Sequence, residues 1–159
     1  MFMNYLYKTV SPVGELTLSS DGKNLTGLWL AGQKYFAAPS GEYKELPVFE
    51  LARKWLESYF FGSEPDIKIP LAPEGSDFRK AVWNRLLEIP YGKSTTYGDI
   101  AKKLGASARA VGGAVGHNPI SIIIPCLRVL GAGGKLTGYA GGLENKVKLL
   151  GIEGIILSN

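Results

Sequence analysis

Apolar and polar residues alternate along three short segments near the N-terminus of the chain. The alternation runs through residues 5–7, 15–19 and 25–30. Asp21-Gly22, between the second and third segments, is typical of a hairpin turn. The N-terminal part of the chain therefore predicts a small antiparallel sheet.

Farther along the chain, the spacing of apolar residues changes from a strand period to a helix period. Residues 31–47 are rich in glycine and proline and predict a loop. The apolar residues that follow fall on one helix face, at positions 51, 52, 55, 56, 59 and 60. We expect this helix to cover the sheet and to end at Gly62. The proline-rich stretch 63–75 then predicts a connector, so we divide the chain into domains 1–72 and 73–159.

The second domain opens with a pattern typical of a core helix. Ser76 or Asp77 is suited to cap its N-terminus, and Pro90 should stop it. The residues expected to face inward are Phe78, Val82, Leu86 and Ile89. The second domain is therefore predicted to be mostly helical, and the whole chain to be an α/β (α+β) protein.

Two short helices joined by a glycine turn are predicted next. Thr95 or Thr96 can cap a helix that runs to Leu104, and Gly105 supplies its C-terminal turn. Ser107 can then cap a second helix that lasts to about Gly116. This arrangement is typical of a helix-turn-helix.

One face of the second short helix has almost no side chains. Arg109, Gly112, Gly113 and Gly116 share this face, and each mid-helix glycine costs roughly 0.5–1 kcal/mol relative to alanine. Either a large partner approaches the bare face, or another helix of the same protein packs tightly against it. Arg109 suits contact with a phosphate or a nucleic-acid groove, although a lone exposed arginine is more often a solvated surface residue.

Composition limits the chemistry that the chain can perform. Its 159 residues include one cysteine and one histidine, so neither an intramolecular disulfide nor a structural zinc site of the usual four-ligand kind can form within it. The N-terminus lacks the pattern of a signal peptide, and no run approaches the roughly 18 apolar residues of a membrane span. We expect a cytoplasmic, monomeric protein without a metal or a cofactor. The net charge of +4 permits an anionic partner but does not require one.

The single cysteine, Cys126, follows an apolar run of β-branched residues that should cross the core. Residue type alone favours an inert buried cysteine. However, six of the twelve residues in 131–142 are glycine, interrupted by Tyr139, which is more backbone flexibility than a structural hairpin needs. The glycine-rich segment instead indicates main chain that closes around a flat ligand beside the thiol.

Five motifs around this cysteine resemble those of the O6-alkylguanine-DNA alkyltransferases, also called methylated-DNA-protein-cysteine methyltransferases. The motifs are Tyr91–Tyr97, Ala108–Ala114, Gly116–Pro119, Ile124–Val129 and Leu136–Glu144. Their order and spacing agree with the family over residues 76–153. Residues 11–16 are similar to the family's N-terminal domain, so the resemblance implies a ribonuclease-H-like sheet followed by a domain like a winged helix-turn-helix.

The resemblance implies repair of DNA that contains O6-alkylguanine. The helix-turn-helix would enter the minor groove of double-stranded DNA through Thr96, Gly112 and Gly113. The alkylated guanine would be flipped out, and Arg109 would fill the gap in the stack. Cys126 would attack the alkyl carbon directly and keep the alkyl group, so each molecule would act once.

The resemblance also implies roles for residues around the base. Tyr97 would hydrogen-bond the guanine and help to neutralise it as it leaves; the alternative is an ordinary core tyrosine. Tyr139 and the backbone of Ala140 would form the pocket wall. The carbonyl groups of Cys126 and Val129 would accept hydrogen bonds from the guanine amine.

Two further residues would support the active-site loop. Arg128 would hold it, unless this arginine forms only a surface salt bridge, and Asn118 would brace the turn before the buried segment.

Leu127 departs from the family pattern, which has a histidine after the cysteine. In the family, this histidine relays the thiol proton through water to a glutamate, which is matched here by Glu153. Leucine can neither accept a proton nor stabilise a thiolate, so we expect slower alkyl transfer. Without its partner, Glu153 could be just a helix-end charge. His117 lies at the end of the recognition helix, where a solvated or capping role is expected.

Two other functions remain open from the sequence. A binding module could recognise alkylguanine and flag it for other repair proteins without chemistry, although relatives of that kind lose the cysteine. A cysteine hydrolase would need a histidine base, and none lies in a suitable position.

Overall fold

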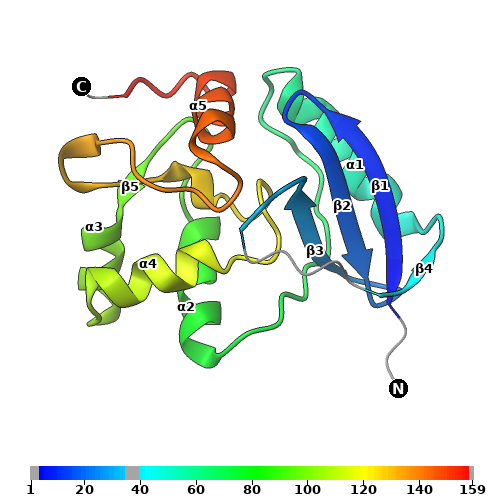
Figure 1. Cartoon of the computed structure of the whole chain (residues 1–159), viewed down its shortest axis with the longest axis horizontal. Helices are drawn as coiled ribbons and strands as arrows, with labels where there is room; N and C mark the ends of the chain where they lie inside the picture. The colour runs from blue at the N-terminus through cyan, green and yellow to red at the C-terminus, as the bar shows by residue number, and fades with distance from the viewer. Residues whose placement is uncertain (1–3, 35–39, 158–159) are drawn as a thin grey trace.

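The N-terminal lobe of the molecule is a sheet with one helix packed against it. The computed structural model describes residues 4–34 and 40–157. Three strands pair antiparallel, as the alternation predicted: β1 (Tyr5–Ser11), β2 (Gly14–Ser20) and β3 (Leu25–Leu30). Helix α1 (Pro47–Phe60) contacts all three strands, and Figure 1 shows it against the sheet on one side of the molecule. The predicted sheet and its covering helix are confirmed.

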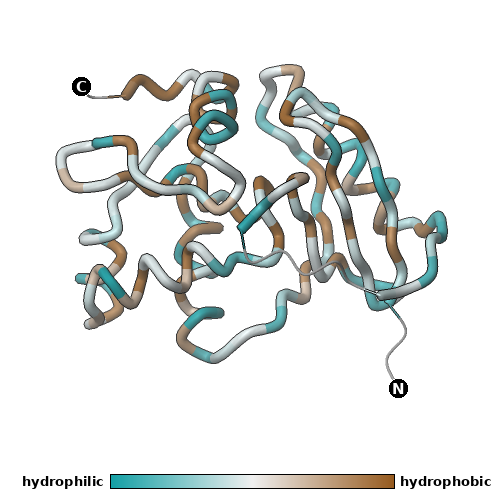
Figure 2. The backbone as a smooth tube through the Cα atoms, in the orientation of Figure 1, coloured by the Kyte–Doolittle hydropathy of each residue, from teal (hydrophilic) through white to brown (hydrophobic). Residues whose placement is uncertain are grey.

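Leucines at alternate positions form the core of this lobe. Leu16 and Leu18 on β2 are fully buried, as are Leu28 and Leu30 on β3. Each such side chain contributes roughly 1.5–3 kcal/mol when it leaves water. Apolar and polar positions recur in turn along the strands in Figure 2, so the sheet presents a continuous apolar face to α1.

A fourth strand lies inside the segment that the sequence predicted to be a loop. Strand β4 (Glu42–Tyr43) pairs parallel with β1, which gives the sheet order β3-β2-β1-β4. A strand of two exposed residues has no apolar alternation to reveal it. Its formation depends on the free edge of β1, a distant part of the chain.

The C-terminal lobe begins with α2 (Asp77–Leu87). The Ser76 hydroxyl caps it by accepting a hydrogen bond from the backbone N–H of Arg79 at 3.2 Å. Val82 and Leu86 are buried as predicted, whereas Phe78 is 37% exposed, so its predicted inward position is wrong. Trp83 fills the interior instead, and its indole N–H donates to the carbonyl of Ala114 at 2.8 Å. The Trp83 indole thus lies where α2 packs against the helix that contains Ala114.

The helix-turn-helix consists of α3 (Tyr97–Leu104) and α4 (Ala108–Gly116). Thr96 caps α3 and Ser107 caps α4, each through its side-chain oxygen. Between them, Gly105 has a φ of 63°, the left-handed conformation that glycine adopts without strain. All three of these local predictions are confirmed.

The rest of the C-terminal lobe surrounds a short parallel ladder. Its elements are β5 (Thr95–Thr96), the 3₁₀ turn η1 (Cys126–Arg128), β6 (Val129–Leu130), the turn η2 (Ala132–Gly134) and α5 (Leu143–Ile152). Strand β5 pairs with β6, which ties the start of the helix-turn-helix to the segment that follows Cys126. Among the described residues, no helix is long and apolar enough to cross a membrane.

The two lobes meet along the outer edge of β3. Leu28 donates its N–H to the carbonyl of Pro119 at 2.9 Å and accepts from the N–H of Ser121 at 3.0 Å. Leu25 makes a similar pair of bonds with Pro70 and Ala72 in the connector. These contacts cover an edge that would otherwise be open to other strands, and they fix the segment that carries Cys126 against the sheet.

Candidate functional site

The sole cysteine lies at the end of a buried segment and at the start of a tight turn. Residues 120–125 are all buried, and Cys126 itself is 5% exposed at the first position of η1. Asn118 holds the segment in shape: its side-chain NH₂ donates to the carbonyl of Ile124 at 2.8 Å, and its side-chain oxygen accepts from the N–H of Ile120 at 3.0 Å. Ile122 has a φ of 71°, a strained value for a β-branched residue, so the segment is held in a conformation that it would not adopt alone.

The thiol opens into a cavity of about 310 Å³. This volume is within the usual range for small-molecule sites. The described residues that line it are Lys34, Tyr97, Gly112, Gly113, Val115, Gly116, His117, Cys126, Gly138, Tyr139 and Ala140. The cavity therefore brings together five of the residues that the sequence singled out around the thiol: Tyr97, Gly112, Gly113, Tyr139 and Ala140.

The glycine face of α4 forms one wall of this cavity and is not packed against another helix. A Cβ at Gly113 would have no described atom within 4 Å outside its own helix, and one at Gly112 would meet only Tyr97, at 3.9 Å. Internal packing therefore does not require these glycines. Of the two explanations left open by the sequence, approach of a partner to the bare face fits this geometry.

Two hydroxyl groups close to residues of the cavity lining are buried without a hydrogen bond among the described residues. They are Oγ1 of Thr137 and the hydroxyl of Tyr139. Thr137 lies close enough to Tyr97, and Tyr139 to Cys126, to influence their pKa values, but neither pair has the geometry of a hydrogen bond. Buried polar groups are nearly always paired, so the Tyr139 hydroxyl is available to a polar group that enters the cavity.

Burial determines the ionisation of the groups around the cavity. It raises the pKa of the Cys126 thiol, and this effect exceeds the opposing influences of Asn118, the Lys146 charge and Tyr139. Burial also raises the pKa of Tyr97, and the pKa of Tyr139 well above its ordinary value. At neutral pH both tyrosines are therefore proton donors, and the thiol is mostly uncharged.

Lys146 is a site residue that the sequence analysis missed. It is fully buried on α5, and its ammonium donates to the carbonyl of Val129 at 2.6 Å and to that of Gly138 at 3.3 Å. Burial lowers its pKa to about 8. No carboxylate oxygen of the described residues lies within 4.0 Å of it, and its charge acts on the Cys126 thiol, whose pKa it lowers. A lysine on an amphipathic helix normally predicts a solvated position, so its residue type did not reveal its burial.

Arg128 and Glu153 form a buried ion pair on the other side of η1. Arg128 Nε donates to Glu153 Oε1 at 2.8 Å, and the carboxylate side chain is fully buried. Glu153 Oε1 also accepts from the N–H of Gly92 at 3.0 Å, and Oε2 accepts from the Tyr59 hydroxyl at 2.6 Å. The pair is therefore not the surface salt bridge that the sequence left open for Arg128, and Glu153 is not a solvated helix-end charge.

Three further residues predicted to belong to the site, Arg109, Thr96 and Val129, lie outside the cavity lining. Arg109 is exposed near the start of α4, and Thr96 caps α3. Val129 lies in β6, where its carbonyl accepts from Lys146. His117 does line the cavity, and it caps α4 with Nδ1 2.8 Å from the carbonyl oxygen of Gly113, the capping position that the sequence suggested.

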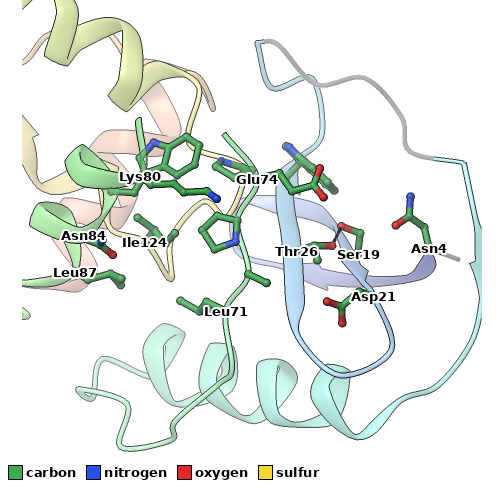
Figure 3. Close-up of a pocket in the computed structure, with 15 residues that line it drawn as sticks. Asn4, Ser19, Asp21, Thr26, Leu71, Glu74, Lys80, Asn84, Leu87 and Ile124 are labelled. Atoms are coloured by element: carbon green, nitrogen blue, oxygen red, sulfur yellow. Dashed lines mark hydrogen bonds between the residues drawn. The ribbon is translucent and has the colours of Figure 1, made fainter. Parts of the chain in front are cut away.

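A larger cavity, of about 690 Å³, lies between the two lobes. Figure 3 shows its lining: Ser19 and Thr26 from the sheet, Glu74 from the connector, and Lys80 and Asn84 from α2. Its described lining contains no cysteine or histidine. Of these lining residues, Ile124 is the one nearest to Cys126 in sequence. The smaller cavity is therefore the candidate active site. Among the described residues, no group of three or more His, Cys, Asp or Glu side chains could hold a metal ion.

Comparison with known proteins identifies close relatives of this arrangement. Residues 4–73 match the model of the 6-O-methylguanine DNA methyltransferase ribonuclease-like domain, and residues 77–155 match that of the DNA-binding domain of the same proteins. A methylated-DNA–protein-cysteine methyltransferase of Methanosarcina acetivorans is 47% identical over 147 residues, covering 91% of this chain and 94% of that protein. One of Haemophilus influenzae is 48% identical, covering 96% and 89%.

A solved structure shares the fold over nearly the whole chain. The crystal structure of Mycobacterium tuberculosis OGT in complex with DNA superimposes with a TM-score of 0.86 at 44% identity. The match covers 94% of this chain and 92% of the other. The order of an N-terminal antiparallel sheet and a helical C-terminal lobe is thus common to both proteins.

Proposed function

The chain belongs to the 6-O-methylguanine DNA methyltransferase family, and from this premise we propose that it repairs double-stranded DNA by transferring the alkyl group of O6-alkylguanine to Cys126. The observation that carries the proposal is the position of the thiol, at a cavity walled by a helix face without side chains. DNA can approach such a face closely, and the cavity can receive a base that has left the stack. The protein is then a methyltransferase that acts once per molecule.

The proposed reaction is a direct displacement. The sulfur of Cys126 forms a bond to the alkyl carbon, and the bond from that carbon to guanine O6 breaks. The electron pair stays on the guanine, which then takes a proton from the Tyr97 hydroxyl. The raised pKa of Tyr97 keeps this hydroxyl protonated at neutral pH, and solvent restores its proton afterwards. The thiol proton leaves to water before the attack.

The residues around the base have proposed roles that follow from their positions. Arg109, exposed near the N-terminal end of α4, enters the stack in place of the flipped guanine. Tyr139 and Ala140 contact the base from the opposite wall, where the unpaired Tyr139 hydroxyl offers a hydrogen bond. Thr96 lies at the start of the helix-turn-helix, where it contacts the DNA backbone. The carbonyl of Val129 has a second lone pair for the guanine amine beside its bond to Lys146.

Ionisation of the thiol is the difficult step in this chain. Leu127 is fully buried and supplies no base, and the Glu153 carboxylate is occupied by Arg128, Gly92 and Tyr59. The positive charge of Lys146 lowers the pKa of Cys126. We therefore propose that Lys146 supports the thiolate and that transfer is slow at neutral pH. The rate should rise as the pH increases toward the raised thiol pKa.

We place the protein in the cytoplasm as a monomer, where its free thiol stays reduced. A repair assay tests the function itself. A duplex containing one O6-methylguanine should lose the lesion in proportion to the protein added, one equivalent per molecule, with no further turnover. Retained binding of the lesion without any loss of the methyl group would instead identify a binding module.

A further inference from the structure

One wall of the candidate active-site cavity rests on the N-terminal lobe. Residues 138–140 form this wall. The backbone N–H of Lys34, in the turn that follows β3, donates to the carbonyl of Ala140 at 2.7 Å. A Cβ on Gly141 would come within 3.1 Å of the Leu30 side chain, so the glycine allows the wall to pack closely on the end of β3. The C-terminal lobe carries the thiol, and the N-terminal lobe supports the wall beside it.

A buried glutamine in the same turn joins β3 to the segment that carries the thiol. Gln33 is 7% exposed, and its Oε1 accepts from the N–H of Leu30 at 3.1 Å and from the hydroxyl of Ser121 at 3.0 Å. The Leu30 N–H can only donate, so the side-chain oxygen of Gln33 must face it, and the Ser121 hydroxyl is then the second donor. One buried oxygen atom thus connects the end of β3 to a residue 88 positions away from Gln33.

The segment that begins at Ser121 depends on its surroundings for its shape. The backbone N–H of Ser121 donates to the carbonyl of Leu28 at 3.0 Å. The next residue, Ile122, has the strained φ of 71°, and Cys126 follows four positions later. Backbone strain persists only where neighbouring contacts hold it in place. The hydrogen bond from the Ser121 hydroxyl to Gln33 is one of these contacts, and a side chain of the other lobe makes it.

We propose that Gln33 is a positioning residue for alkyl transfer. Its side chain holds the segment that carries Cys126, and the backbone of the next residue holds the wall at Ala140. One turn of the N-terminal lobe therefore fixes the distance between the thiol and the wall that contacts the base. Gln33 itself does not line the cavity. This inference rests on the proposed function for the identity of the reaction.

A displacement at carbon is sensitive to this distance. The reacting atoms must lie about 3–3.5 Å apart and in line, and a misplacement of about 1 Å can slow a reaction by about a hundredfold. Loss of the Gln33 contact should therefore lower the rate at which bound substrate reacts. Because the contact is buried and far from any DNA surface in the proposed complex, the affinity for DNA should not change.

The test removes each end of the hydrogen bond between Gln33 and Ser121 separately. Gln33→Met keeps a side chain of similar length without the acceptor, and Ser121→Ala removes the donor. Gln33→Glu keeps an acceptor oxygen and is the conservative variant. The matched control is Ser19→Ala, which removes a buried serine hydroxyl of the same lobe. That hydroxyl is hydrogen-bonded to Thr26 at 2.8 Å and does not line the active-site cavity.

Single-turnover rates are measured with free O6-benzylguanine and with a duplex that contains O6-methylguanine, over a range of concentrations and pH. Gln33→Met and Ser121→Ala should each lower the maximal rate on both substrates by about tenfold. Their duplex affinity and the midpoint of their pH–rate profile should stay unchanged, because neither DNA contacts nor titratable groups are altered. Gln33→Glu should recover most of the maximal rate, and Ser19→Ala should retain it.

The double variant tests whether the two residues act through one bond. Gln33→Met combined with Ser121→Ala should be no slower than Gln33→Met alone. Maximal rates for both single variants that match Ser19→Ala would overturn the proposal. A loss that appears in duplex affinity, with the maximal rate intact, would also overturn it.

Hydrogen exchange gives a readout that does not depend on alkyl transfer. The N–H of Cys126 donates to the carbonyl of Ile124 at 2.8 Å. This N–H should exchange faster in Gln33→Met than in Ser19→Ala, because the segment has lost its contact with the other lobe. If even the unmodified protein transferred no alkyl group, the proposed function would fail. Equal exchange in the two variants would then overturn the role of Gln33, and faster exchange in Gln33→Met would support it.

Discussion

The turn formed by Cys126, Leu127 and Arg128 separates two buried polar regions that differ in how fully their groups are paired. On the Arg128 side, the Glu153 carboxylate accepts three hydrogen bonds, and a second arm of the guanidinium donates to the carbonyl of Ile89 at 2.7 Å. On the Cys126 side, the hydroxyls of Thr137 and Tyr139 have no partner among the described residues. The first region stabilises the turn. The second leaves two buried hydroxyls unpaired.

This contrast explains how the turn that carries Cys126 is supported with a leucine at position 127. Glu153 does not depend on a residue at position 127 for its partners, because Arg128, Tyr59 and Gly92 provide them. The loop therefore retains its support when position 127 is leucine. We therefore expect the residue at position 127 to affect proton transfer from the thiol and not the position of the thiol.

The largest expected effect is a loss of stability when the region around Arg128 loses the Glu153 carboxylate. Glu153→Ala leaves the buried Arg128 guanidinium without its carboxylate, so the free energy of unfolding should fall by about 3–5 kcal/mol. Urea denaturation measures the change. The control is Glu57→Ala, which removes an exposed partner of Arg53 and should leave the stability almost unchanged. Similar losses for the two variants would mean that Glu153 adds no more than a surface charge does.

A pair of tyrosine variants compares the two regions directly. Tyr59→Phe removes a hydrogen bond to a buried carboxylate and should destabilise the protein by about 1.5–3 kcal/mol. Tyr139→Phe removes a hydroxyl without a hydrogen bond, so its stability should change by less than about 1 kcal/mol. Thermal unfolding of both proteins gives the comparison. A greater loss from Tyr139→Phe would show that its hydroxyl is paired after all.

Leu127→His tests whether the missing base limits the rate. A histidine beside the thiol can accept its proton, so alkyl transfer at neutral pH should accelerate at least about tenfold. Leu127→Asn is the control, since it introduces polarity at the same buried position without a base. Single-turnover kinetics on a duplex with O6-methylguanine provide the rates. If both variants match the unmodified protein, ionisation of the thiol is not the limiting step.

A smaller change in rate is expected at Lys146. Its charge lowers the thiol pKa, so Lys146→Met should raise that pKa and slow transfer at neutral pH by several-fold, moving the pH–rate profile to higher pH. The stability of the same variant gives a second measurement. Because burial lowers the pKa of Lys146 from 10.5 to about 8, the unfolded chain binds more protons between these values, and Lys146 makes stability rise with pH there.

The rise of stability with pH that Lys146 causes should be absent from Lys146→Met. The difference in unfolding free energy between the two proteins should therefore change between about pH 8 and 10.5 and stay constant below this window. A constant difference throughout, with an unmoved pH–rate profile, would show that Lys146 does not act on the site through its charge.

The features predicted from sequence are those with a local cause. The caps at Ser76, Thr96 and Ser107 depend on a side chain and the N–H three residues later, so a short stretch of sequence reveals them. The cysteine, the glycine face and Tyr139 were singled out by composition and spacing, and Tyr97 was singled out by the resemblance to a known family. Their individual roles remain predictions.

The features that were missed depend on contacts between distant parts of the chain. Strand β4 exists because β1 has a free edge, and Lys146 is buried because two carbonyl groups from other segments meet its ammonium. Trp83 is buried because its indole meets the carbonyl of Ala114 on α4, another distant part of the chain. Residue type and period carry no information about such neighbours.

The central claim is that Cys126 accepts the alkyl group, and intact-protein mass spectrometry with peptide mapping tests it most directly. After incubation with a duplex containing O6-methylguanine, the account predicts a mass increase of one methyl group per molecule, located on the peptide that carries Cys126. Cys126→Ser should show no increase under the same conditions. An unmodified protein after prolonged incubation, or a methyl group located on any other residue, would contradict the account.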